Sequence, residues 1–174
     1  MDSTMVEMRR YKNIKINEDF VKEVLLSAES NSLLDISGAD LSGDEVYYLC
    51  DTILGYRLFA YQSVNISHTS IALGFDTLVN TISECKGLHT LRATNNELSH
   101  DNGASIARLL STTGSLKKLD LSVNNLSDKG IAAIFGCYSK DFTTDIALST
   151  NLSLFSLTEL NLINNDIHDM GVRH

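Results

Sequence analysis

The chain has 174 residues, a length that suits one domain. Its 14 basic and 22 acidic residues give a net charge of −8, which disfavours a nucleic-acid backbone as the main partner. No apolar run reaches transmembrane length and no signal-peptide core lies near the start, so we expect no membrane insertion and a cytoplasmic location, with delivery into a host cytosol by a dedicated machine left open.

The first predicted element is a helix over residues 17–29. Asn17 suits its N-cap, and the acidic Glu18 and Asp19 suit its first turn. Its apolar face consists of Phe20, Val21, Val24, Leu25 and Ala28. We expect this helix, within an N-terminal segment of residues 1–31, to cap the unit that follows, because the open end of a stacked array exposes apolar core and a strand edge.

From residue 32 onward, predicted strands alternate with predicted helices. The alternation of apolar residues predicts strands around residues 34–36, 59–61, 91–93, 119–121 and 160–162. Apolar stripes at helical spacing follow at residues 46–54, 71–82, 106–110 and 131–135. Each stripe begins behind a polar turn with a serine suited to N-capping, and these serines are Ser42, Ser67, Ser99 and Ser127.

One spacing template underlies these units. In its best copy Leu119, Leu121 and Leu126 surround Asn124, and the predicted strands fit with offsets of 25, 32, 28 and 41 residues. The asparagine recurs as Asn96 and Asn165, but the template places Ala39 and Val64 there in the first two units. We expect the asparagines to turn inward and bond to the backbone as a ladder. The longest offset leaves room for an insertion near residues 139–156.

The stretches "LHTLRATNNELS", "LKKLDLSVNNLSDKGI" and "LTELNLINNDIHDMGV" resemble leucine-rich repeats, with the pattern LxxLxLxxNxL. The unit length and the following Gly130 and Gly171 are similar to the ribonuclease-inhibitor subtype. The resemblance implies an α/β fold, a βα solenoid with a curved parallel sheet on its concave face and helices on its convex face. Residues 32–174 would hold about five repeats.

The last of these repeats is incomplete, because the chain stops at "MGVRH" where a further helix should begin. Two explanations stay open. The chain is a fragment of a longer protein, or its uncapped C-terminal end packs on another molecule, which includes self-association.

The predicted strands place one set of side chains on the concave face of the sheet. The candidate partner-binding residues are Asp35, Ser37, Gln62, Arg92, Thr94, Lys118, Asp120, Ser122, Glu159 and Asn161. Their mixed charge suits a protein partner better than a small molecule. For any single residue, solvation alone is the alternative reading.

No motif for catalysis or cofactor binding is present. The sequence lacks a GxSxG motif, a phosphate-binding loop and cysteine spacing suited to a metal. Cys50, Cys85 and Cys137 are predicted to be buried thiols of a reducing compartment. His68 and His100 share a template position but have no third ligand in register. We therefore expect no enzyme activity, no cofactor and no bound metal.

The resemblance implies a recognition or scaffold module that binds a partner protein through its concave face. The alternative is a regulatory or targeting part of a larger system, such as a small-GTPase regulator or a pathogen effector acting in host cells.

Overall fold

The computed structural model describes residues 32–54, 61–135 and 156–168. The helix predicted over residues 17–29 lies outside the described residues, as does nearly all of the insertion expected near residues 139–156.

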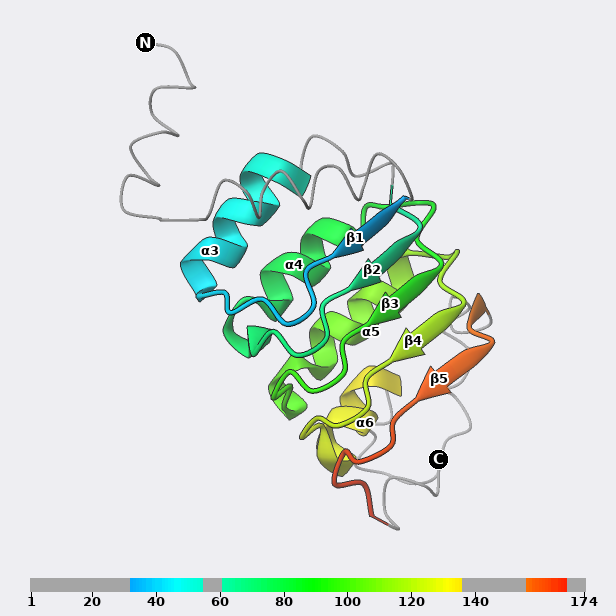
Figure 1. Ribbon diagram of the computed structural model, residues 1–174. Coiled ribbons are helices and arrows are strands. Elements are labelled where there is room, and N and C mark those ends of the chain that lie inside the picture. Colours follow the sequence, from blue (N-terminus) through cyan, green and yellow to red (C-terminus); the bar gives the residue numbers. More distant parts are fainter. Residues whose placement is uncertain (1–31, 55–60, 136–155, 169–174) are drawn as a thin grey trace.

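Five short strands form one parallel sheet in the order of the sequence, β1-β2-β3-β4-β5 (Figure 1). The strands are β1 (Leu33–Asp35), β2 (Ser63–Asn65), β3 (Thr90–Arg92), β4 (Lys118–Asp120) and β5 (Glu159–Asn161). Parallel neighbours cannot be joined by a tight hairpin, so each pair needs a crossover. The described crossovers contain helices, which makes the fold α/β as the sequence predicts.

The helices lie side by side along one face of the sheet (Figure 1). In chain order they are α3 (Gly43–Tyr48), the π-helix η1 (Leu49–Leu54), the 3₁₀ turn η2 (Ile71–Leu73), α4 (Phe75–Ile82), the 3₁₀ turn η3 (His100–Asn102), α5 (Gly103–Thr112) and α6 (Ser127–Phe135). Ser42 caps α3 in a capping box with Glu45, and Ser99 caps η3 in the same way with Asn102. These two predicted caps are confirmed.

Close packing of α5 against α6 depends on a glycine. A Cβ atom added at Gly103 would lie 2.8 Å from the Cβ of Ala133 and 2.9 Å from the carbonyl oxygen of Gly130. Both distances are shorter than real carbon contacts, so only glycine allows the two repeats to approach this closely at that point.

One core lies between the sheet and the helices. Its strand layer consists of Leu34, Val64, Leu91 and Leu119, which are all at most 2% exposed. The corresponding residue of β5, Leu160, is 41% exposed. The helix stripes contribute Val46, Phe75, Leu78, Ile106 and Ile134, so the helical spacing in the sequence identified core positions correctly.

The second repeat corrects the expected register. The strand pairing places Val64 opposite Leu34 on one side and Leu91 on the other, so Val64 occupies the position assigned to Phe59. Thr69 consequently stands where the template has asparagine, and the offsets between successive strands, from Leu34 to Leu160, become 30, 27, 28 and 41 residues. The expected register satisfied only the apolar positions of the template.

The same correction moves Ser67 away from the helix start. The 3₁₀ turn η2 begins after Ser70, whose side chain makes no capping hydrogen bond. The predicted N-cap at Ser67 is therefore wrong.

Candidate functional site

Buried asparagines fix the strand ends at one register. Asn96, Asn124 and Asn165 are at most 5% exposed. Each Nδ2 donates to a backbone carbonyl of the preceding repeat, over 2.7 Å to Ile66, 2.9 Å to Ala93 and 2.8 Å to Leu121. The predicted asparagine ladder is confirmed, and we call these three residues the inner ladder.

The amide oxygens of the inner ladder accept hydrogen bonds from backbone N–H groups of the same preceding repeats. The Oδ1 atom of Asn96 accepts the Thr69 N–H at 2.9 Å, and that of Asn124 accepts the Asn96 N–H at 2.9 Å. Thr69 stands in for asparagine only in part, because its hydroxyl donates to Ile66 O of its own repeat at 2.8 Å. Neighbouring repeats are thus locked together by side chains as well as by strand pairing.

This register arranges the side chains that point away from the core in three rows across the sheet, which we call the outer sheet face. The first row is Leu33, Ser63, Thr90, Lys118 and Glu159. The second row is Asp35, Asn65, Arg92, Asp120 and Asn161. The third row, just beyond the strands, is Ser37, Ser67, Thr94, Ser122 and Ile163. Neighbouring side chains in a row stand about 5 Å apart.

The structure brings nine of the ten predicted site residues onto this face and leaves out Gln62. Gln62 precedes β2, where its carbonyl oxygen accepts the N–H groups of His89 and Thr90 at 2.8 and 3.1 Å. Its assignment to the face came from the wrong register. The face residues missed in the second repeat are Ser63 and Asn65 of β2 and Ser67 just after it.

A second set of side-chain hydrogen bonds shapes the outer sheet face. In four strands the oxygen of the second-row side chain accepts the N–H two residues later, at distances of 2.9 Å for Asp35, 3.2 Å for Asn65, 3.0 Å for Asp120 and 3.2 Å for Asn161. We call these four residues the outer ladder. Each bond is local, because donor and acceptor belong to one repeat.

Arg92 is the one member of the second row that cannot make this bond, since a guanidinium has no acceptor. The N–H of Thr94, which would have donated to it, instead reaches the hydroxyl oxygen of Ser67 at 3.3 Å. In addition, the Thr94 hydroxyl lies 3.2 Å from that of Ser122.

The two aspartates of the outer ladder are held as carboxylates. Partial burial raises the pKa of Asp35, but hydrogen bonds from the Ser37 hydroxyl and N–H and from Asn65 outweigh it, and the pKa lies below its ordinary value. The pKa of Asp120 is likewise lowered, because donors led by the Ser122 hydroxyl, at 2.6 Å, and its N–H outweigh the effect of burial.

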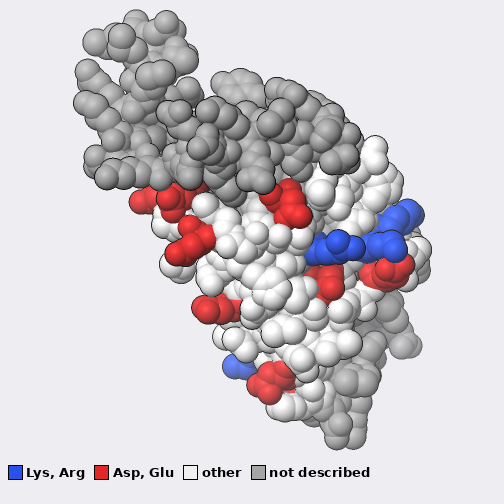
Figure 2. Space-filling view, in the orientation of Figure 1, with Lys and Arg blue, Asp and Glu red and all other residues white. Residues whose placement is uncertain are grey.

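Basic side chains gather on one part of the outer sheet face. Figure 2 shows them side by side over β3 and β4, with acidic groups beside them and further acidic groups along the edge of the strand-to-helix turns. Lys118 pairs with Glu159, with Nζ and Oε1 2.7 Å apart. Lys117 and Arg92 are exposed as well.

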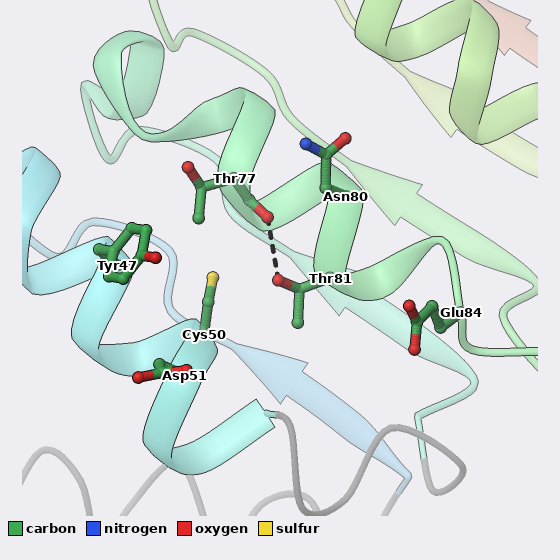
Figure 3. A pocket seen from close by; sticks show the side chains of 7 residues that line it. All are labelled: Tyr47, Cys50, Asp51, Thr77, Asn80, Thr81 and Glu84. Atoms are coloured by element: carbon green, nitrogen blue, oxygen red, sulfur yellow. Dashed lines mark hydrogen bonds between the residues drawn. The ribbon is translucent and has the colours of Figure 1, made fainter. Parts of the chain in front are cut away.

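The helix side carries a shallow hollow of about 330 Å³ between α3–η1 and α4 (Figure 3). Its lining residues are Tyr47, Cys50, Asp51, Thr77, Asn80, Thr81 and Glu84. Burial raises the pKa of the Cys50 thiol to about 11, so the group is protonated near neutral pH and is a poor nucleophile. Cys50 and Cys85 are free and buried as predicted, while Cys137 lies outside the described residues.

The described residues contain no group of three or more His, Cys, Asp or Glu side chains placed to hold a metal ion. His68 and His100 do not share a repeat position once the register is corrected. His68 lies in the turn after β2, 2.9 Å from the Asn95 amide, and His100 begins η3. Within the described ranges no helix is long and apolar enough to cross a membrane.

Comparison with known proteins agrees with this repeat structure. Residues 115–135 and 153–173 match the family model described as "Leucine Rich repeat". No curated protein sequence matches the chain.

Several solved structures are similar to the chain, including the following two. The tropomodulin C-terminal domain of Caenorhabditis elegans has 16% sequence identity and a TM-score of 0.52 over 72% of this chain and 66% of that one. A structure titled "Leiomodin-1 Actin-Binding Site 2 (ABS2)" has 16% identity and a TM-score of 0.42 over 87% of this chain and 64% of that one. The chain thus spans a little under two thirds of each, and the likeness to the first is one of fold.

Proposed function

We propose that this leucine-rich-repeat chain is a recognition module, a βα solenoid that binds a partner protein through the concave side of its sheet. The outer sheet face carries this proposal, because it presents three registered rows of side chains on five strands. A broad surface of mixed polarity with arginine and exposed aliphatic groups is typical of a protein interface. The offsets of 27 and 28 residues support the ribonuclease-inhibitor-like subtype.

A protein partner fits this face better than a small molecule does. Small ligands are bound in hollows that bury most of their surface. The rows here are instead stiffened from within, by the outer ladder and by contacts such as Thr94 with Ser122. A face fixed before binding loses less conformational entropy when a partner docks.

The proposal includes a non-enzymatic role in a reducing compartment such as the cytoplasm. It is supported by the two buried thiols, whose pKa is raised to about 11 for Cys50 and for Cys85 by burial above all. Protonated, enclosed thiols persist where disulfides do not form.

The experiment blocks the outer sheet face without disturbing the ladders. Thr90 lies in the first row of the central strand, and Thr90→Trp puts a bulky side chain there at a position where β-structure tolerates it. Ala104→Trp adds the same side chain to an exposed position on α5, in the same repeat. Asp120 is a poor probe, because its removal also breaks the outer ladder.

Wild type and both variants serve as bait in a pull-down from cell lysate, after their melting temperatures have been matched, with bound proteins identified by mass spectrometry. We expect a protein that is retained by wild type and Ala104→Trp and is lost with Thr90→Trp. Equal capture by all three baits, or loss with Ala104→Trp alone, would place the interface elsewhere and overturn the proposal.

A further inference from the structure

We propose that Arg92 is the anchor through which the outer sheet face binds a carboxylate of an acidic peptide segment in its partner. This inference rests on the proposed function and specifies the chemistry of the partner.

Arg92 stands where local structure favours a different residue. Four of the five second-row positions hold Asp or Asn, and all four accept the N–H two residues later. Arginine gives up that bond, and the Thr94 N–H is left with a 3.3 Å contact to Ser67. The other four second-row residues all make this stabilising hydrogen bond. A residue that gives it up marks a position selected for something other than stability.

The guanidinium of Arg92 is also available. Within the described part of the chain it forms no hydrogen bond and no ion pair, although its charge helps to lower the pKa of Asp35. By contrast, Lys118 is already paired with Glu159. The planar fork of an arginine matches the two oxygens of a carboxylate, so an exposed, unpaired Arg92 is a ready site for an Asp or Glu side chain.

The surroundings favour a carboxylate over a phosphate. Asp35 and Asp120 lie in the same row as Arg92, on either side of it. A dianionic phosphate would be repelled by both, and phosphate sites generally use several arginines. A single carboxylate bound by the fork meets less repulsion, and the exposed Lys117 just before β4 adds positive charge in the neighbouring repeat.

The experiment uses a random twelve-residue peptide library displayed on phage, selected against the whole chain as wild type, Arg92→Asn, Arg92→Lys and Arg108→Asn. Asparagine fills the same row position in β2 and β5, so Arg92→Asn restores the acceptor. Arg108 is exposed on α5 and controls for loss of one positive charge. The proteins are made in bacteria, where the Asn-x-Thr sequence created at Arg92→Asn is not glycosylated.

We expect wild type and Arg108→Asn to enrich peptides rich in Asp and Glu. The affinity of a synthesised winner, measured by fluorescence anisotropy, should fall about tenfold or more in Arg92→Asn and less in Arg92→Lys, which keeps the charge but not the fork. The melting temperature of Arg92→Asn should equal or exceed that of wild type, a combination that a merely structural arginine would not produce.

Three results would overturn the inference: no acidic enrichment on wild type, equal affinity for Arg92→Asn, or a lower melting temperature in that variant. The variant Thr90→Trp distinguishes a failure of the Arg92 anchor from a failure of the proposed interface itself. If selected peptides are not acidic yet are lost with Thr90→Trp, the interface stands and only the carboxylate anchor falls. If Thr90→Trp leaves every selected peptide bound, both fall.

Discussion

The inner and the outer ladder both supply hydrogen-bond acceptors to backbone N–H groups at the strand ends, one inside the core and the other near solvent. The inner ladder is buried, and each of its asparagines joins two repeats. The outer ladder faces away from the core, and its N–H bonds stay within one repeat. A buried bond between repeats has no substitute from water, whereas a local bond near solvent does. The outer ladder could therefore give up one position to Arg92, while the inner ladder keeps asparagine in the repeats of β3, β4 and β5.

The first two repeats show how far the inner ladder relaxes. The Thr69 hydroxyl donates to Ile66 O of its own repeat at 2.8 Å, and the Thr69 N–H donates to Asn96 Oδ1 at 2.9 Å. Among the described residues Ala39 makes a backbone bond alone, from its N–H to Ile36 O at 3.2 Å. No described strand precedes β1, so at Ala39 there is no neighbouring carbonyl in the described residues for an asparagine to reach.

Asn124→Ala is the change with the largest expected effect. It removes the acceptor of the Asn96 and Leu98 N–H groups and the donor to Ala93 and Leu121. Because each orphaned buried group costs about 1–3 kcal/mol and partial relaxation recovers some of this, we expect a loss of about 3 kcal/mol in the free energy of unfolding.

Urea unfolding measures this loss, with the exposed neighbour Asn125→Ala as the control, expected to change stability by less than about 0.5 kcal/mol. Similar values for the two variants would remove the distinction between buried and local ladders.

The inner ladder and most of the fold were predictable because two sequence patterns, the apolar spacing and the recurring asparagine, indicate the same register. Around Leu91, Leu119 and Leu160 the apolar spacing and the asparagine agree, and the parallel sheet, the helix stripes and the ladder follow. In the second repeat two registers satisfied the apolar spacing, and a threonine replaced the asparagine.

A signal for the correct register was nevertheless present. Asn65-x-Ser67 repeats Asp35-x-Ser37 and Asp120-x-Ser122, and these polar pairs mark the outer face. The outer ladder itself could not be read from leucine spacing, since it depends on which side-chain oxygen meets which N–H.

Asp120→Ala tests the outer ladder in the same assay. It removes the acceptor for the N–H and the hydroxyl of Ser122, at 3.0 and 2.6 Å. Asp120 is only half-buried, so water can take over part of these bonds, and we expect a loss of about 1 kcal/mol.

The double variant Asp120→Ala with Ser122→Ala closes a thermodynamic cycle that isolates the side-chain pair. A loss equal to that of Asn124→Ala would mean that the outer ladder also carries the junction between repeats.

Acid should weaken the outer ladder before the inner one, because the outer ladder contains the carboxylates of Asp35 and Asp120, whereas the inner ladder consists of asparagines, which do not titrate. The pKa values of Asp35 and Asp120 lie below their ordinary value of 3.8 in the folded chain. The stability they contribute is thus complete above the unfolded pKa, and it is lost as the pH falls through the lowered folded values.

The free energy of unfolding, followed from pH 6 to about 2.5 by denaturant titration, should therefore fall less steeply below about pH 4 in Asp35→Asn/Asp120→Asn than in wild type. The amide keeps an acceptor but does not titrate. Asp40→Asn controls for loss of one exposed carboxylate. Identical acid profiles for wild type and the double variant would show that these carboxylates do not stabilise the fold.

Ile163→Thr should have the smallest effect. Ile163 is 67% exposed in a row that otherwise holds serine and threonine, and its N–H donates to Asn161 whatever its side chain is. We expect the free energy of unfolding to change by less than about 0.5 kcal/mol, measured by urea unfolding beside Leu121→Thr, whose buried position should cost several times more. A loss above about 1 kcal/mol for Ile163→Thr would mean that this side chain is part of the packing. An unchanged stability with weaker partner binding would instead assign Ile163 to the apolar part of the interface, in the third row of the outer sheet face, whereas Lys118 lies in the first row.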